Sequence, residues 1–118
     1  VVDRDVVGEQ AIATLISHRS GKMNLGLLSA DGWAGDALFR WERADDDDGV
    51  TLWVTRWVSA AAAADFEYGY LRALERWTGA PAATVGDPPT ERRFLRAGKA
   101  ISVARNGQEV RVRVWYVE

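Results

Sequence analysis

The pair Asn106-Gly107 constrains the fold of this chain more than any other feature of its sequence. Asn-Gly favours the two-residue turn of a β-hairpin, because both turn positions need a positive φ that these residues tolerate. Apolar and polar residues alternate on either side of the pair, which is the period of a strand with one buried face. The pattern therefore predicts an antiparallel hairpin with strands at 99–105 and 108–117.

A two-residue turn at this pair also predicts the register of the hairpin. It places Val103 opposite Val110 and Ile101 opposite Val112, so that four branched apolar side chains share one face. Serine, alanine and arginine side chains share the other face. We expect the first face to pack on the core and the second to be wet and basic.

The first part of the chain has the spacing of helices. Apolar residues at helical intervals predict a helix over 6–19 with Asp5 as its N-cap, and a weaker, shorter helix over 23–30 that stops at Asp31-Gly32. Val7, Ala11, Leu15 and His18 fall on one stripe of the first helix, with Ile12 and Ile16 beside it.

A second main helix has clearer signals. Ser59 is a favourable N-cap, a run of alanines follows it, and Gly79 and Pro81 end the helical pattern after Trp77. The apolar stripe of this helix contains Ala63, Phe66, Tyr70, Leu74 and Trp77.

Two strands are predicted between the helices. Residues 37–42 alternate, whereas residues 50–58 are apolar on both faces, which is typical of an inner strand that is covered on both sides. The acidic run at 45–49 is expected to form the turn between them. Residues 78–90 are expected to form a long loop, and one further strand is expected to begin near Phe94.

Together these elements predict an α+β fold, in which an antiparallel sheet of four or five strands packs against two main helices. The expected order is helix, short helix, strand, strand, helix, an additional strand near Phe94, strand, strand. Residues 1–118 are expected to form one domain. Because the chain begins at Val1 rather than Met and shows no signal peptide, we expect it to be a piece of a longer protein.

Composition excludes several classes of function. The chain has no cysteine, which excludes disulfides, zinc–thiolate sites and thiol nucleophiles. Its formal charge of −2 disfavours a general binder of nucleic acid, which needs Lys and Arg to neutralise phosphates. The charge is uneven, however, because residues 1–90 carry 8 basic and 14 acidic side chains whereas residues 91–118 carry 7 basic and 3 acidic ones.

No metal or cofactor site is predicted. The acidic run at 45–49 suggests a calcium loop, but in an EF-hand alignment the first and last ligand positions would fall on Ala44 and Thr55. A solvated turn is therefore favoured. His18 is the only histidine, so one chain cannot form a site that needs two.

No catalytic residue is predicted either. Ser17, Ser20, His18 and Asp36 supply the residue types of a serine triad, but none of the serines lies in a nucleophile-elbow motif. An enzyme that uses Asp36 or Asp65 as a general base is a disfavoured third class, since no partner at a recognisable spacing supports it.

Six tryptophans provide either a core or the walls of a ligand pocket. The core is the favoured interpretation. If a pocket exists, Trp53, Trp57 and Tyr70 are its candidate walls and Arg56 its anchor. The sequence leaves open whether Arg56 is a buried anion receptor or an exposed side chain stacked on an indole.

The closing hairpin has some features of a nucleic-acid-binding face, because it combines arginines with an aromatic residue. Those residues are Arg105, Arg111, Arg113 and Trp115. Alternating arginines on a solvated strand are the more common explanation, and they also discourage edge-to-edge aggregation.

The segment 31–36 is interpreted as a structural motif. We expect Gly32 to end a helix, Trp33 to close one end of the core and Gly35 to permit a bend. Asp36 is expected to accept hydrogen bonds from backbone amides at the start of the next strand.

Several short motifs resemble a poorly characterised accessory domain of exported and surface proteins. The motifs are Gly8-Glu9, Gly32-Trp33-Ala34-Gly35-Asp36, 51–59 with 63–66, and the closing Arg-Asn-Gly-Gln-Glu-Val segment. That C-terminal domain occurs in bacteria and haloarchaea, sometimes behind a metallopeptidase-like region, with the pattern Gly-Trp-x-Gly-Asp, Trp-x-x-x-Trp-Asp-Thr, Asp-Ala-x-Glu-Phe. Here Val58-Ser59 replaces Asp-Thr, so an acidic site at position 58 is not carried over.

The resemblance implies an exported or cell-surface location and a noncatalytic accessory or interaction role. It brings no established catalytic residue, and the chain has no His-Glu-x-x-His motif, so peptidase activity is not transferred. The expected partners are other domains of the parent chain or a separate protein, without nucleic acid or cofactor. The alternative is a small-ligand-binding module that uses an aromatic face of the sheet.

Overall fold

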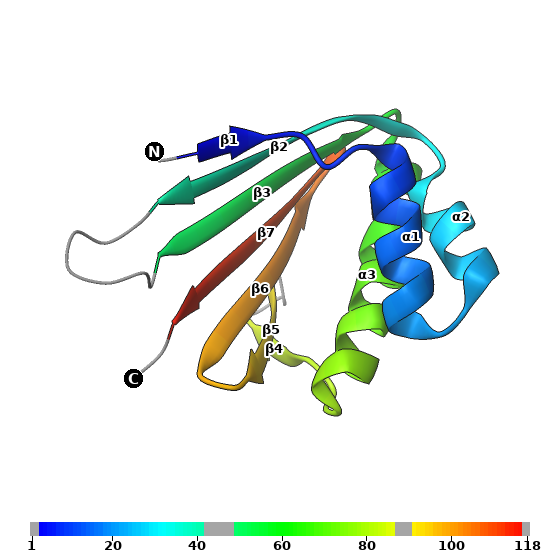
Figure 1. Cartoon of the computed structure of the whole chain (residues 1–118). Coiled ribbons are helices and arrows are strands. Elements are labelled where there is room, and N and C mark those ends of the chain that lie inside the picture. The colour runs from blue at the N-terminus through cyan, green and yellow to red at the C-terminus, as the bar shows by residue number, and fades with distance from the viewer. Residues whose placement is uncertain (1–2, 42–48, 87–90, 117–118) are drawn as a thin grey trace.

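Three helices cover one face of a seven-stranded sheet in the computed structural model, which describes residues 3–41, 49–86 and 91–116 (Figure 1). The helices are α1 (Glu9–Ser20), α2 (Met23–Ala30) and α3 (Ala60–Thr78). The strands are β1 (Asp3–Asp5), β2 (Trp33–Trp41), β3 (Val50–Trp57), β4 (Ala83–Val85), β5 (Glu91–Arg96), β6 (Lys99–Asn106) and β7 (Glu109–Tyr116).

The sheet is antiparallel throughout, with the strand order β1-β2-β3-β7-β6-β5-β4. The prediction of four or five strands against two main helices is therefore wrong, because the sheet has seven strands and three helices pack on it. The missed strands are the two edges, β1 and β4, of three residues each. A three-residue strand is too short to show an alternating pattern, and only its pairing with a neighbour defines it. The additional strand expected near Phe94 is β5.

The closing hairpin is present, but the predicted register is wrong by two residues. Val103 lies opposite Val112 and Ile101 opposite Val114, and the turn residues are Gly107 and Gln108. Of these two turn residues, only Gly107 has a positive φ, of 62°. A shift of two residues keeps each side chain on its predicted face, because side chains alternate with a period of two.

Helix α1 begins later than the sequence suggests, and it buries a different stripe. Its N-cap is Gly8, whereas Asp5, the predicted cap, is the last residue of β1. The buried residues are Ile12, Ile16 and Ser20, and His18 is exposed. Both stripes of this helix carry apolar residues, so only its packing against α3 and α2 selects the buried one. Helix α2 has the predicted bounds.

Helix α3 supplies the centre of the core. The Ser59 side chain accepts a hydrogen bond from the Ala62 amide at 3.0 Å, so the predicted N-cap is confirmed. Phe66 is fully buried and stacks on Trp57 and Tyr70, with ring centroids 4.7 and 5.5 Å apart. None of the described helices is both long and apolar enough to span a membrane.

Helix α2 packs closely on α3 through small residues. A Cβ atom added at Gly69 of α3 would lie 1.8 Å from the Ser29 hydroxyl oxygen of α2. Ser29 is itself buried. Glycine at position 69 therefore allows a close approach of the two helices, which holds the three-helix layer together.

Strand β3 is an inner strand, between β2 and β7, but the expectation that it is covered on both sides is wrong. Trp53, Thr55 and Trp57 point toward the helices and are buried. Leu52 and Val54 point the other way and are only partly buried, because no described helix or strand covers that side. We call this uncovered side of the sheet the open face.

Candidate functional site

Of the four residues predicted to form a ligand pocket, the fold brings the three aromatic ones together and leaves Arg56 apart. Trp53 and Trp57 are 4% and 2% exposed, and their rings pack with Phe66 and Tyr70 in the core. Arg56 lies on the open face, where its side chain is 73% exposed and its Nη2 atom lies 3.5 Å from Glu109 Oε1. The three aromatic rings thus fill the interior, on the other side of the sheet from Arg56.

Asp36 is a hydrogen-bonding centre for three separate segments. Its two carboxylate oxygens accept the backbone amides of Val7 and Gly8, at 2.7 and 2.9 Å, and the indole N–H groups of Trp33 and Trp53, both at 3.0 Å. Asp36 therefore does bind backbone amides, as expected. These amides directly precede α1, however, and they lie 28 and 29 positions from Asp36 in the sequence. The carboxylate joins the start of α1 to β2 and β3.

The glycines around Asp36 support this arrangement. Gly32 has a φ of 87°, and its carbonyl oxygen accepts the Val58 amide at 2.9 Å. Gly35 has a φ of 154°, and the pairing of β2 with β3 shifts between Trp33 and Gly35. Such a bulge turns the Trp33 side chain toward Asp36. Trp33 itself is partly buried and packs against the core.

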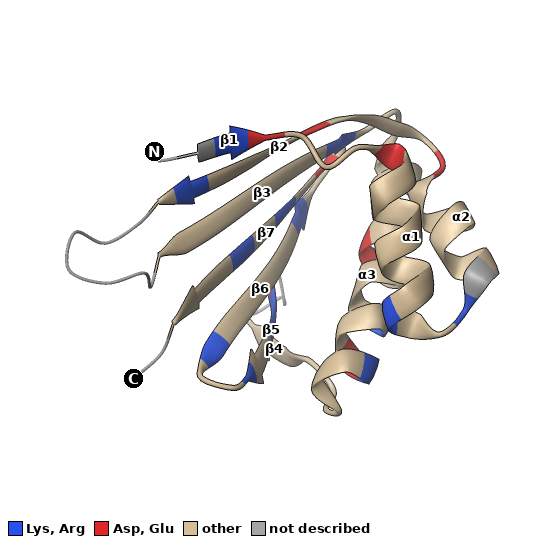
Figure 2. Ribbon diagram, viewed as in Figure 1, with Lys and Arg blue, Asp and Glu red and all other residues tan. Residues whose placement is uncertain are grey.

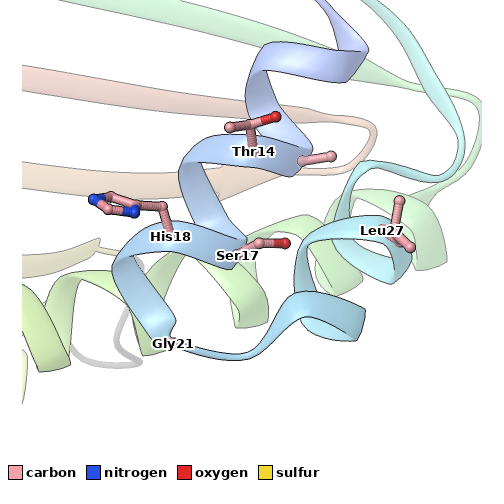
Figure 3. Close-up of a pocket in the computed structure, with 6 residues that line it drawn as sticks. Thr14, Ser17, His18, Gly21 and Leu27 are labelled. Carbon is pink, nitrogen blue, oxygen red and sulfur yellow. The ribbon is translucent and has the colours of Figure 1, made fainter.

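The residue types of a serine triad are not assembled. A hollow of about 630 Å³ lies beside α1 and α2, lined by Ala13, Thr14, Ser17, His18, Gly21 and Leu27. Figure 3 shows the His18 ring pointing away from Ser17, which faces α2. Asp36 is engaged elsewhere, and Ser20 Oγ accepts the Lys22 amide at 3.1 Å. Among the described residues, no group of three or more histidines and carboxylates could hold a metal ion.

The open face carries a stripe of ion pairs across β3, β7 and β5. Glu109 lies 3.5 Å from Arg56 and 2.6 Å from Arg111. Glu91 lies 3.1 Å from Arg93 and 3.2 Å from Arg113. Figure 2 shows the arginine segments in blue along β7. Each glutamate is shared by two arginines, so this stripe has a net charge of +2.

Aromatic side chains flank the ion pairs. Arg93 and Arg113 lie over the Trp115 ring, at 5.7 and 5.4 Å from its centroid. The ring centroids of Phe39 and Trp41, both on β2, lie 6.0 Å apart. This combination of flat rings and guanidinium groups is typical of interfaces that bind partner side chains.

Two separate hollows lie on the open face, one near each end of β6, and between them Ser102 is buried. The side chains of β6 on this face are small, Ala100, Ser102 and Ala104, whereas β5 and β7 carry longer ones. A hollow of about 680 Å³ at one end is lined by Glu91, Ala104, Arg105, Asn106, Glu109 and Arg111. A more apolar hollow of about 460 Å³ at the other end includes Pro81, Leu95, Ala100 and Trp115.

Glu91 is the most strongly constrained carboxylate of this face. It accepts a hydrogen bond from the Ser102 hydroxyl, which is the main reason that its pKa lies below the ordinary value. Burial, the second-largest cause, acts to raise the pKa, and a hydrogen bond from Arg113 and the charges of Arg93 and Arg113 each lower it further. Glu91 therefore stays ionised and holds both arginines in place.

The Glu91→Gln substitution should make stability less dependent on pH. A carboxyl whose pKa is lowered by folding contributes stability above its ordinary pKa, here 4.5, and this contribution is lost as the pH falls through the lower folded value. We expect the variant to be less stable at neutral pH by about 1 kcal/mol or less, because the ion pairs are exposed. Urea unfolding at neutral and acidic pH should show the difference shrinking in acid. An equal difference at both pH values would contradict this role.

Sequence reasoning found only part of this face. The alternating Arg111, Arg113 and Trp115 were recognised, and the solvated-strand interpretation was favoured. Glu91 and Arg93 were not singled out, because they join the stripe only through the pairing of β5 with β6 and of β6 with β7. The period-two spacing of Glu91, Arg93 and Leu95 is a signal that could have placed them on one face of a strand.

Comparison with known proteins gives a family but no activity. A family model described as a domain of unknown function (DUF8575) matches residues 1–116. No curated protein and no solved structure matches the chain. Because the model covers nearly the whole chain, the chain belongs to the DUF8575 family, an uncharacterised domain family.

Proposed function

We propose that this chain is a noncatalytic interaction domain whose open face binds a partner polypeptide. The observation that supports it best is the composition of that face, on which four arginines share two glutamates beside Trp115. A solvated sheet face needs neither partly exposed aromatic rings nor a net positive stripe. An interface uses both.

The chemistry of the face favours one kind of partner. Its net positive ion-pair stripe complements carboxylates, and the apolar hollow beside Trp115 and Leu95 can take one aliphatic or aromatic side chain. The two separate hollows near the ends of β6 are suited to two side chains of one extended segment. Addition of a partner strand at a sheet edge is less favourable, since β1 and β4 are only three residues long. The proposed partner is therefore an extended acidic segment with an apolar side chain.

The proposed setting is an accessory role in a larger exported protein. This part of the proposal is supported only by the motifs around Gly32-Trp33-Ala34-Gly35-Asp36, and the acidic segment would belong to another domain of the parent chain or to a separate protein. The full-length gene product tests the setting directly. An upstream signal sequence and further domains would support it, and a complete cytosolic protein that begins near Val1 would contradict it.

Binding can be tested with a copolymer of glutamate and tyrosine, which combines carboxylates with aromatic side chains. We expect the copolymer to shift amide signals of β5, β6 and β7 in NMR spectra of the ¹⁵N-labelled protein. The double variant Arg111→Gln, Arg113→Gln should weaken binding about tenfold, because two exposed ion pairs are worth up to about 1 kcal/mol each. Added salt should weaken binding to the parent protein.

Arg72→Gln is a matched control for this experiment. Arg72 lies on α3, pairs with Glu75 at 3.0 Å, and has a side chain 45% exposed, against 52% for Arg113. Its substitution should leave binding unchanged. Equal binding of a lysine–tyrosine copolymer, or signal shifts confined to the helices, would overturn the proposal.

A further inference from the structure

A separate hollow lies on the helix-covered side of the sheet, away from the open face. It has a volume of about 190 Å³ and lies between α1, α3 and the strands β6 and β7. Its lining is apolar except for a few polar side chains, and it includes Leu15, Arg19, Tyr70, Trp77, Lys99 and Val114. The hollow is not needed for the interaction proposed above.

Three cations that have no carboxylate partner among the described residues lie around this hollow. None of the ion pairs in the described part of the chain includes Arg19, Arg96 or Lys99. The guanidinium carbons of Arg19 and Arg96 each lie 4.0 Å from the Trp77 ring centroid. Lys99 Nζ lies 5.3 Å from the Tyr116 ring centroid. Four arginines of the open face, in contrast, are paired with Glu91 or Glu109.

Tyr70 adds a neutral polar group to the same hollow. Burial raises its pKa to about 12, although the charge of Arg19 acts in the opposite direction. The phenol is therefore protonated at neutral pH and can donate a hydrogen bond. It brings no negative charge to compensate Arg19.

The hollow continues toward the end of the sheet that the helices leave uncovered. A second hollow, of about 390 Å³, shares Lys99 and Val114 with the first. Its lining residues include Leu38, Thr51 and Tyr116, and also Arg40, which is a further cation beside Lys99. The two together provide a place for one charged group beside Lys99 and for an apolar body along Val114 and Leu38.

We infer that this helix-side cleft binds a small amphipathic carboxylate. The carboxylate lies between Lys99 and Arg19, which line the same hollow, and the apolar body packs on Val114 and Leu38. A ligand with a positively charged or uncharged head group leaves Lys99 and Arg19 without a counter-charge. The cleft therefore selects for a ligand whose head group is a carboxylate anion.

Decanoate, decylammonium and decanol test this selectivity, because they share one chain length and differ in head group. Each is titrated below its micelle concentration into the ¹⁵N-labelled protein. We expect decanoate to shift the Lys99 and Val114 amides and the Trp77 indole signal, and to bind at least about tenfold more tightly than decanol. Decylammonium should cause no shifts at these positions.

The two lysines of the chain provide a matched pair of variants. Lys99→Met removes the charge and keeps the length of the side chain, and it should weaken decanoate binding about tenfold. Lys22→Met alters an exposed lysine at the start of α2 and should leave binding unchanged. Arg19→Gln should reproduce the loss, and the dispersion of the NMR spectrum shows whether each variant is folded.

Two results would overturn the inference: equal affinities for decanoate and decanol, or unchanged decanoate affinity in both Lys99→Met and Arg19→Gln. Decanoate shifts confined to β5 and the open side of β7 would also overturn it. None of these results bears on the glutamate–tyrosine copolymer, whose binding depends on Arg111 and Arg113. The two proposals can therefore fail independently.

Discussion

Replacing Asp36 by alanine is expected to lower the free energy of unfolding by about 3–5 kcal/mol. The substitution leaves four N–H donors without their acceptor, two on the backbone at Val7 and Gly8 and two on the indoles of Trp33 and Trp53. A hydrogen bond to a charged group contributes about 1.5–3 kcal/mol, and water replaces part of this at a partly buried site. The loss also frees the start of α1 from β2. Urea unfolding measures the change.

Two comparisons separate the hydrogen bonds of Asp36 from a general effect of removing a charge. Asp31→Ala removes an exposed carboxylate five positions earlier, and its effect should stay within about 0.5 kcal/mol. Asp36→Asn retains one acceptor oxygen and should fall between the parent and Asp36→Ala. A loss below about 1 kcal/mol for Asp36→Ala would show that these four hydrogen bonds do not hold the segments together.

The Phe66→Ala substitution is expected to destabilise the protein by about 3–5 kcal/mol, the range for deleting a buried aromatic side chain. Phe66 is fully buried in α3 and contacts three other rings, those of Trp53, Trp57 and Tyr70. Its removal leaves a cavity between the helix and the centre of the sheet. The loss should appear as a lower midpoint in urea unfolding with an unchanged slope.

Tyr68 provides the control for Phe66, because it lies on the same helix and is exposed. Tyr68→Ala removes a ring of similar size whose described ring contact is with Arg72, at 5.2 Å. Its effect should stay within about 0.5 kcal/mol. Equal losses for the two variants would mean that the aromatic cluster is not the centre of the core.

Elements with strong local signals were predictable from the sequence. Ser59 caps α3 as expected, because capping depends on atoms within one turn of the chain. Helix α2 also has the predicted bounds, although its sequence pattern is weaker. The strands of the closing hairpin were also predicted, whereas the predicted register was wrong by two residues. The register depended on which two residues formed the turn, and Gly107 alone satisfies the positive φ there.

The functional surfaces were less predictable, because they depend on contacts between distant segments. Asp36 was expected to bond amides near its own strand, but its backbone partners lie 28 and 29 positions away. Arg113 was visible as a polar residue on an alternating strand, whereas its partner Glu91 lies 22 positions earlier. A periodic pattern shows which side of an element a residue occupies, and it carries no information about the neighbour on that side.

The sequence by itself determined the approximate positions of the three helices and of the longer strands β2, β3, β5, β6 and β7, and which side chains share one face of a strand. These features depend on interactions between residues close together in the sequence: helix capping, turn geometry and the periods of helix and strand. Only the tertiary structure decided which face of β3 the helices cover, because both faces are apolar and burying either one removes apolar area from water. The packing of Phe66 and α3 on Trp53 and Trp57 made that choice. Arg56, Arg111 and Arg113 were thereby left on the open face.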